Sequence, residues 1–103
     1  MPGASDESRN QALGFLLQAR DTLKMLEASG ESPGVTPEQV RRSLAYLLGD
    51  LGNAQLGAKK PDVAKRTFVE AVAMWERLAN ARPKSPEYES GLSWCRRRLE
   101  ELQ

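Results

Sequence analysis

The chain has 103 residues with 15 Lys and Arg against 14 Asp and Glu, a net charge of +1, no histidine and one cysteine. This size fits a single domain, and so balanced a charge gives no reason to expect nucleic acid or an anionic membrane as partner. Histidine, the commonest general base and metal ligand, is missing from the sequence. A lone cysteine can form neither an internal disulfide nor a cysteine-rich metal site. We therefore expect a protein that is not an enzyme and needs no metal or cofactor.

The beginning of the chain, Met1–Glu7, is acidic and lacks the basic-then-apolar order of a signal peptide. No apolar run approaches the ~20 residues needed to cross a bilayer. The sequence therefore predicts a cytoplasmic protein without a membrane-spanning segment.

Strong helix formers dominate the composition and β-branched residues are scarce, which favours an all-α fold. The first periodic segment predicts a helix over about residues 6–29. Apolar residues recur there at spacings of three and four, as on one face of a helix: Ala12, Leu16, Ala19, Leu23 and Leu26. The connection Gly30–Val35, rich in glycine and proline, ends this helix.

A second helix is predicted over about residues 37–57 and has a well-marked start. Thr36 can cap free N–H groups, Pro37 suits the first helical position, and Gln39 can complete a capping box. Gly57 is expected to close this helix.

The third and fourth helices are predicted over about residues 61–82 and 86–102. Pro83 ends the third, and Ser85 with Pro86 repeats the cap-and-proline start for the fourth. Short connections favour antiparallel neighbours. The expected fold is therefore all-α, with four antiparallel helices in one domain.

The chain repeats itself. A shift of 48 residues places Tyr46 on Trp94 and Leu51 on Leu99, so the second and fourth helices are one kind of element. A shift of 52 residues places five apolar positions of the first helix on five of the third. Two kinds of helix therefore alternate along the chain, as in helical hairpins cut from an array.

The segment around the second hairpin resembles the tetratricopeptide repeat. The resemblance rests on the spacing of six residues: Leu48, Leu51, Gly52, Ala64, Phe68 and Ala71. It implies that Gly52 and Ala64 let the two helices of a hairpin approach closely, and that Phe68 fills the space between hairpins. The full motif covers about residues 45–82, and half-repeats flank it.

The longer period, with Glu76 in place of a terminating proline, is similar to extended repeats of bacterial proteins. Gln55 also departs from the family, because an aromatic residue usually stands there. The resemblance implies a short right-handed solenoid that acts as a non-enzymatic scaffold or regulatory module and binds a protein or peptide.

The resemblance also implies where a partner would bind. The second and fourth helices correspond to helices of the first kind, which line the concave groove of such arrays, and the first and third helices to those of the second kind. Seven residues are expected there: Tyr46, Asp50, Asn53, Trp94, Arg97, Arg98 and Glu101. The alternative for both aromatic rings is an ordinary core position. Trp75, on a helix of the second kind, is expected to pack between hairpins.

The run Arg96–Arg98 has two interpretations. Consecutive helical residues lie about 100° apart, so the three side chains diverge and suit a solvated terminal helix. They could instead contact an acidic ligand, whereas nothing else supports nucleic acid. Asn53 with Arg97 also resembles part of a clamp for a peptide carboxylate, although the lysine that completes such a clamp is Gly49 here.

Two further possibilities stay open. The first helix could drive homodimerisation, because apolar residues beyond its regular stripe widen its apolar surface: Leu13, Phe15, Leu17 and Met25. Alternatively, the chain could form a plain four-helix bundle in which the fourth helix packs on the first. Cys95 is expected to be a packed thiol, since no histidine exists to activate it.

Overall fold

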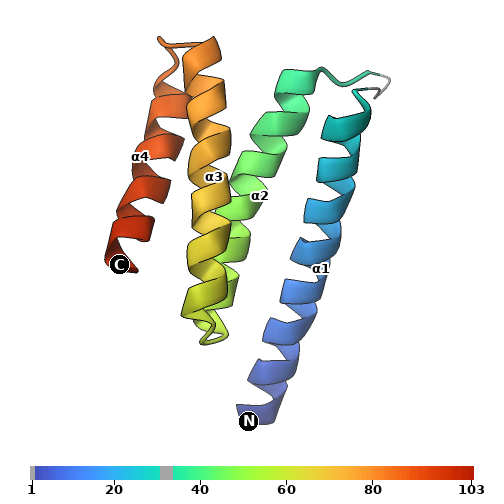
Figure 1. The fold of residues 1–103 in the computed structure, drawn as a ribbon. Helices are drawn as coiled ribbons and strands as arrows, with labels where there is room; N and C mark the ends of the chain where they lie inside the picture. Colours follow the sequence, from blue (N-terminus) through green and yellow to red (C-terminus); the bar gives the residue numbers. More distant parts are fainter. Residues whose placement is uncertain (1, 31–33) are drawn as a thin grey trace.

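A computed structural model describes residues 2–30 and 34–103, with side chains from residue 7 onward. The described residues form four α-helices and no strand (Figure 1): α1 Pro2–Ser29, α2 Pro37–Gly57, α3 Pro61–Ala81 and α4 Pro86–Glu101. The prediction of an all-α fold is therefore confirmed. The helix α1 begins at Pro2 and not near residue 6, because a proline fits the first helical turn. Part of the predicted connection Gly30–Val35, residues 31–33, lies outside the described residues.

The helices pack in the order of the sequence: α1 on α2, α2 on α3 and α3 on α4. Figure 1 shows α1 and α4 at opposite ends of this row. The chain extends over 45 × 32 × 19 Å, and its radius of gyration of 14.5 Å exceeds the roughly 13 Å of a compact domain of this length. The fold is an open array of helical hairpins, so the alternative of a closed bundle with α4 on α1 is wrong.

The start of α2 has the predicted capping box. The Thr36 hydroxyl accepts a hydrogen bond from the Gln39 N–H at 3.1 Å, and the Gln39 side chain accepts one from the Thr36 N–H at 2.8 Å. The start of α4 has the first of these two bonds, since the Ser85 hydroxyl accepts from the Tyr88 N–H at 3.3 Å. Both helices of the first kind therefore begin where local sequence signals place them.

The α2–α3 connection is a tight turn centred on Lys59. The Lys60 N–H donates to the Gln55 carbonyl at 2.9 Å and the Lys59 N–H donates to the Leu56 carbonyl at 3.0 Å, as in a Schellman motif. Lys59 has φ 62°, a left-handed conformation that normally favours glycine. The helix ends at Gly57 as predicted, but the left-handed residue is a lysine two positions later.

The core lies between α2, α3 and α4, where two glycines let aromatic rings approach the backbone. A Cβ atom added at Gly52 would lie 2.6 Å from the Phe68 ring, so the predicted close approach at this glycine is confirmed. A Cβ atom added at Gly91 would lie 2.5 Å from the Trp75 ring, a contact that the sequence did not reveal. Phe68 and Trp75 are both buried, as expected for residues that pack between helices.

A buried polar pair, Gln55 and Thr67, lies between α2 and α3. The Thr67 hydroxyl donates to Gln55 Oε1 at 2.6 Å between α2 and α3. An aromatic ring at residue 55 would have to displace this contact. Because the amide oxygen is satisfied, its burial does not carry the cost of an unpaired polar group.

The packed face of α1 differs from the predicted one. Leu13 is 6% exposed and belongs to the core, so it is unavailable for self-association, while Ala12 of the expected stripe is exposed. Leu17 is half-buried. Phe15 and Met25 are 70% and 73% exposed and remain open to solvent.

Candidate functional site

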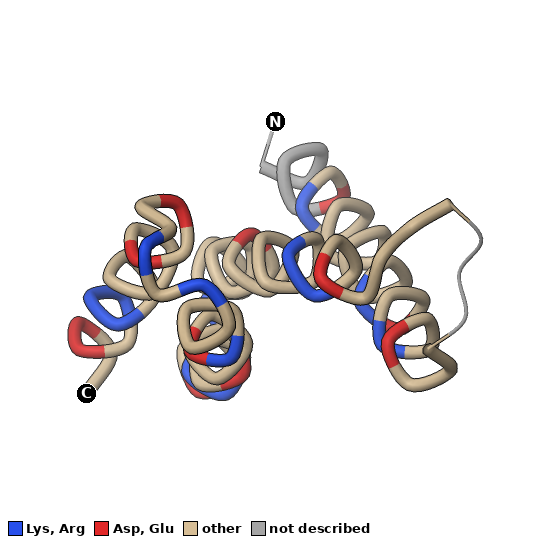
Figure 2. The backbone as a smooth tube through the Cα atoms, turned by 90° about the horizontal axis from the view of Figure 1, so that it is seen from above, with Lys and Arg blue, Asp and Glu red and all other residues tan. Residues whose placement is uncertain are grey.

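A groove of about 390 Å³ lies between α2 and α4, with α3 beneath it. Figure 2 shows helix α3 offset to one side of the row. Trp75 is the one residue of α3 among those that line the groove. Ten residues line it: Ala45, Tyr46, Gly49, Asp50, Trp75, Glu87, Ser90, Gly91, Trp94 and Cys95. Its volume lies in the range of sites that hold a small ligand or a few side chains, which is about 300–1,000 Å³.

Two glycines open this groove. Gly49 faces Trp94, and a Cβ atom there would lie 3.3 Å from the indole ring. Gly91 leaves the Trp75 ring directly against the α4 backbone. Because neither residue has a side chain, the floor of the groove consists of backbone and of the buried Trp75 ring.

Two aromatic rings form the walls. Tyr46 is 48% exposed and Trp94 is 42% exposed, so neither is an ordinary core residue. Their similar exposure agrees with their equivalence in the internal repeat. The Tyr46 ring also meets the Trp75 ring edge-on, with centroids 4.9 Å apart. The walls are therefore held by the core but present apolar surface to solvent.

A charged contact links α2 and α4 at one end of the groove. The Tyr46 hydroxyl and the Arg42 guanidinium each donate a hydrogen bond to Glu87 Oε2 at 2.7 Å. These two donors lower the pKa of Glu87, the tyrosine hydroxyl first and the arginine second. The same hydrogen bond raises the pKa of Tyr46, since it stabilises the protonated phenol.

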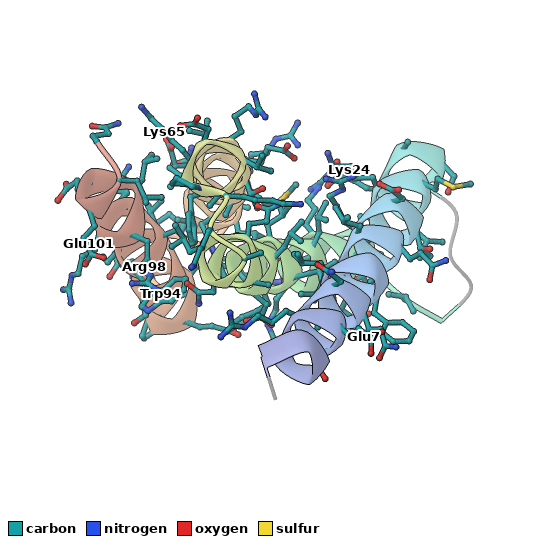
Figure 3. All side chains as sticks on the ribbon, turned by 90° about the horizontal axis from the view of Figure 1, so that it is seen from below. Glu7, Lys24, Lys65, Trp94, Arg98 and Glu101 are labelled. Carbon is teal, nitrogen blue, oxygen red and sulfur yellow. The ribbon has the colours of Figure 1, made fainter. Side chains whose placement is uncertain are left out.

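At the other end, Arg98 crosses from α4 to α2. Its guanidinium donates to Asn53 Oδ1 at 2.6 Å and pairs with Glu101 at 3.2 Å. The Arg98 guanidinium also lies 5.5 Å from the centre of the Trp94 ring, and Figure 3 shows both side chains on the side of α4 that faces α2. Arg98 therefore joins two other predicted groove residues, Asn53 and Glu101, at the groove's edge.

The other two arginines of the run point elsewhere. Arg97 lines a shallow outer hollow next to Trp94, and Arg96 lies 4.0 Å from Glu76 of α3. The three side chains diverge as their helical spacing predicts. Asn53 is engaged by Arg98, whereas Arg97 lies on the outer side of α4, so the structure does not bring together the two residues that resemble part of a carboxylate clamp.

Cys95 lies at the inner wall of the groove and is buried. Burial raises the pKa of its thiol to about 11, against which a contact with Trp75 acts only weakly. The thiol is therefore protonated at neutral pH, as expected for a packed cysteine. Among the described side chains, those of residues 7–30 and 34–103, no group of acidic, histidine or cysteine residues could hold a metal ion. Nor does any helix in the described part of the chain have the length and apolarity to cross a membrane.

Several groove residues escaped the sequence reasoning, notably Glu87, Ser90 and Gly91. Glu87 directly follows the start signal of Ser85 and Pro86, and nothing in the neighbouring sequence marks it as a groove residue. Gly91 carried a usable signal, because a glycine inside a helix costs about 1 kcal/mol relative to alanine and so suggests a close contact. The identity of the contacting ring could not be read from the sequence.

Comparisons with protein-family models, with curated proteins and with solved structures found no match for this chain. The tetratricopeptide resemblance therefore stays a prediction. It rests on residue spacing and not on a relative, so function has to be inferred from the groove itself.

Proposed function

We propose that this protein is a non-enzymatic scaffold or regulatory module that binds a peptide or partner helix in the groove between α2 and α4. The observation that carries the proposal is the pair of half-exposed aromatic walls, Tyr46 and Trp94, around a cavity with a buried floor. Aromatic residues supply much of the binding energy at protein interfaces, especially where they border a pocket. The polar contacts at both ends hold the two walls at a fixed separation.

The proposal includes a tetratricopeptide-like architecture of the extended kind found in bacterial proteins. It is supported by the alternation of two kinds of helix and by the close contact of Gly52 with Phe68. It is also supported by the position of α2 and α4, the two helices of the first kind, on either side of one groove. A reducing, cytoplasmic location is proposed with it, because the one cysteine is free and buried.

Selection from a random peptide library displayed on phage tests this function. We expect the full chain to enrich peptides that bind at least about tenfold more weakly to Trp94→Ala, because truncation of a central aromatic residue removes a dominant contact. Phe15→Ala is the matched control, since it removes an exposed ring on α1, away from the groove. Circular dichroism establishes that both variants fold.

The two variants separate the possible outcomes. Peptides that bind equally to the chain and to Trp94→Ala would show that the groove is not the binding surface. If peptide binding were weakened in Phe15→Ala and unchanged in Trp94→Ala, the binding surface would lie on α1.

Self-association through α1 is a second candidate, favoured by the high exposure of Phe15 and Met25. These side chains lie about 80° apart around the helix at 100° per residue, so they do not form one continuous stripe. Light scattering at a low and a high protein concentration tests it. A mass that doubles with concentration, and returns to the monomer value in Phe15→Gln, would support this candidate; a monomer throughout would exclude it.

A further inference from the structure

The charges that line the groove are of one sign. Of its ten lining residues only Asp50 and Glu87 are charged, and no lysine or arginine is among them. The Glu87 carboxylate is offset by Arg42 at 2.7 Å. Asp50 is exposed and makes no ion pair with any residue that the structure describes. One negative charge in the groove is therefore left without a partner.

The groove's aromatic rings already attract cations within the molecule. The guanidinium of Arg42 lies 5.8 Å from the centre of the Tyr46 ring, and that of Arg98 lies 5.5 Å from the centre of the Trp94 ring. Both distances are within the roughly 6 Å over which a ring attracts a cation. Neither arginine lines the groove, so the space between the two walls is free to receive another cation.

The arginines at the groove's edge do not cancel this preference. Arg98 is engaged by Asn53 and Glu101, and Arg42 by Glu87. Their positive charges are therefore paired, whereas the carboxylate of Asp50 is not. An acidic ligand would have to approach an unpaired carboxylate, which costs free energy instead of releasing it.

From this arrangement we propose that the groove receives a basic side chain, lysine or arginine, from a partner protein. The apolar stem lies between the rings of Tyr46 and Trp94, and the charged end meets Asp50. Lysine and arginine suit such a site because each joins a long apolar stem to a charged head. This inference rests on the proposed function and names the chemistry of its ligand.

Blocked tripeptides test this preference on the full chain. The probes are acetyl-Ala-X-Ala-amide with lysine, norleucine or glutamate at X, which share a backbone and differ in the charge of the side chain. Binding is followed by nitrogen-15 NMR through the Trp94 indole and the Gly49 and Gly91 amides, which lie in the groove. We expect the lysine peptide to bind most tightly, the norleucine peptide about two- to fivefold more weakly, and the glutamate peptide most weakly, because an exposed charge pair has a modest effect.

The variant Asp50→Asn isolates the charge at nearly constant shape. It should weaken the lysine peptide by about two- to fivefold and leave the norleucine peptide unchanged. Asp62→Asn, the same substitution at an exposed position at the start of α3, is the control and should change neither. Added salt should weaken only the lysine peptide, since it screens the charge contact.

Each contrary result has a distinct meaning. Equal binding of lysine and norleucine peptides, stronger binding of the glutamate peptide, or no shift with any probe would overturn the preference for a basic side chain. Library peptides that depend on Trp94 but lack lysine and arginine would refute only this inference. A library without any Trp94-dependent peptide would refute the proposed function itself.

Discussion

Helices α1 and α3 carry the same apolar pattern, yet the structure uses it differently. The five matched positions of α3 are all buried: Ala64, Phe68, Ala71, Trp75 and Leu78. Four of their counterparts on α1 are half-buried, and the fifth, Ala12, is exposed. The helix α3 packs between α2 and α4, whereas α1 packs mainly on α2. Burial in this array therefore depends on how many neighbours a helix has, and not on its pattern alone.

The remaining contacts of α1 are weak. Lys24 pairs with Glu70 at 2.9 Å, Glu27 lies 3.9 Å from Arg77, and Arg9 donates to the Gly57 carbonyl at 3.3 Å. Exposed ion pairs of this kind contribute only about 0–1 kcal/mol each. Among the described residues, α1 places only Leu13 in the buried core, whereas α4 places Tyr88 and Cys95 there. We therefore expect α1 to be the least firmly held helix, and α2 to α4 to form the stable part of the chain.

The largest effect is expected from a matched pair of leucines. Leu78→Ala on α3 should lower the free energy of unfolding by about 2–5 kcal/mol, because it leaves a cavity in a packed core. Leu26→Ala, its counterpart on α1, should cost only about 1–2 kcal/mol, because that side chain is half exposed. Urea unfolding followed by circular dichroism measures both, and equal losses would refute the difference between the two helices.

Glycine substitutions should change stability in opposite directions. Gly52→Ala should lower the free energy of unfolding by about 1–3 kcal/mol, because the new methyl group would overlap the buried Phe68 ring. Gly14→Ala on α1 should raise it by about 0.5–1 kcal/mol, since nothing lies within 4 Å and alanine favours the helix. A stabilising Gly52→Ala, measured by thermal unfolding, would mean that the contact between α2 and α3 is looser than described.

The smallest predicted effect is a loss of stability at acidic pH. Both Glu38, beside Arg82, and Glu87, beside Tyr46 and Arg42, have a pKa below the ordinary 4.5. A lowered folded-state pKa contributes stability that is present above pH 4.5 and is lost as the pH falls through the folded-state value. We expect the melting temperature to fall below pH 4.5 and to fall less in Glu87→Gln.

Tryptophan fluorescence reports on this contact, because the Trp75 ring meets the ring of Tyr46, whose hydroxyl donates to Glu87. If Glu87 carries part of the acid sensitivity, the tryptophan fluorescence should change over the same pH range as the melting temperature. An unaltered acid dependence in Glu87→Gln would show that the contact contributes nothing measurable.

Local sequence signals predicted the features that depend on neighbouring residues. The capping box at Thr36 and the ends of α2, α3 and α4 follow, to within a residue, from spacing within one segment. The alternation of two kinds of helix follows from the repeats at shifts of 48 and 52 residues. The groove was predicted only in part, through Tyr46, Asp50 and Trp94. The polar contacts that join α2 to α4 link residues more than forty positions apart, such as Arg42 and Glu87, and no local rule relates them.

The error in the packed face of α1 has a geometric cause. Leu13 and not Ala12 is buried because α1, with α2 as its main neighbour, settles at a rotation that the pattern does not determine. A pattern gives the width of an apolar face but not the angle at which it meets its neighbour.

The serial packing of the helices also determines how this chain can fold. Every extensive contact joins helices that are consecutive in the sequence, and residues 58–60 alone connect α2 to α3. Loops this short lose little entropy on closure, and proteins rich in such local contacts fold in microseconds to milliseconds. The α2–α3 hairpin is the natural nucleus, onto which α4 and then α1 can add without any long-range search.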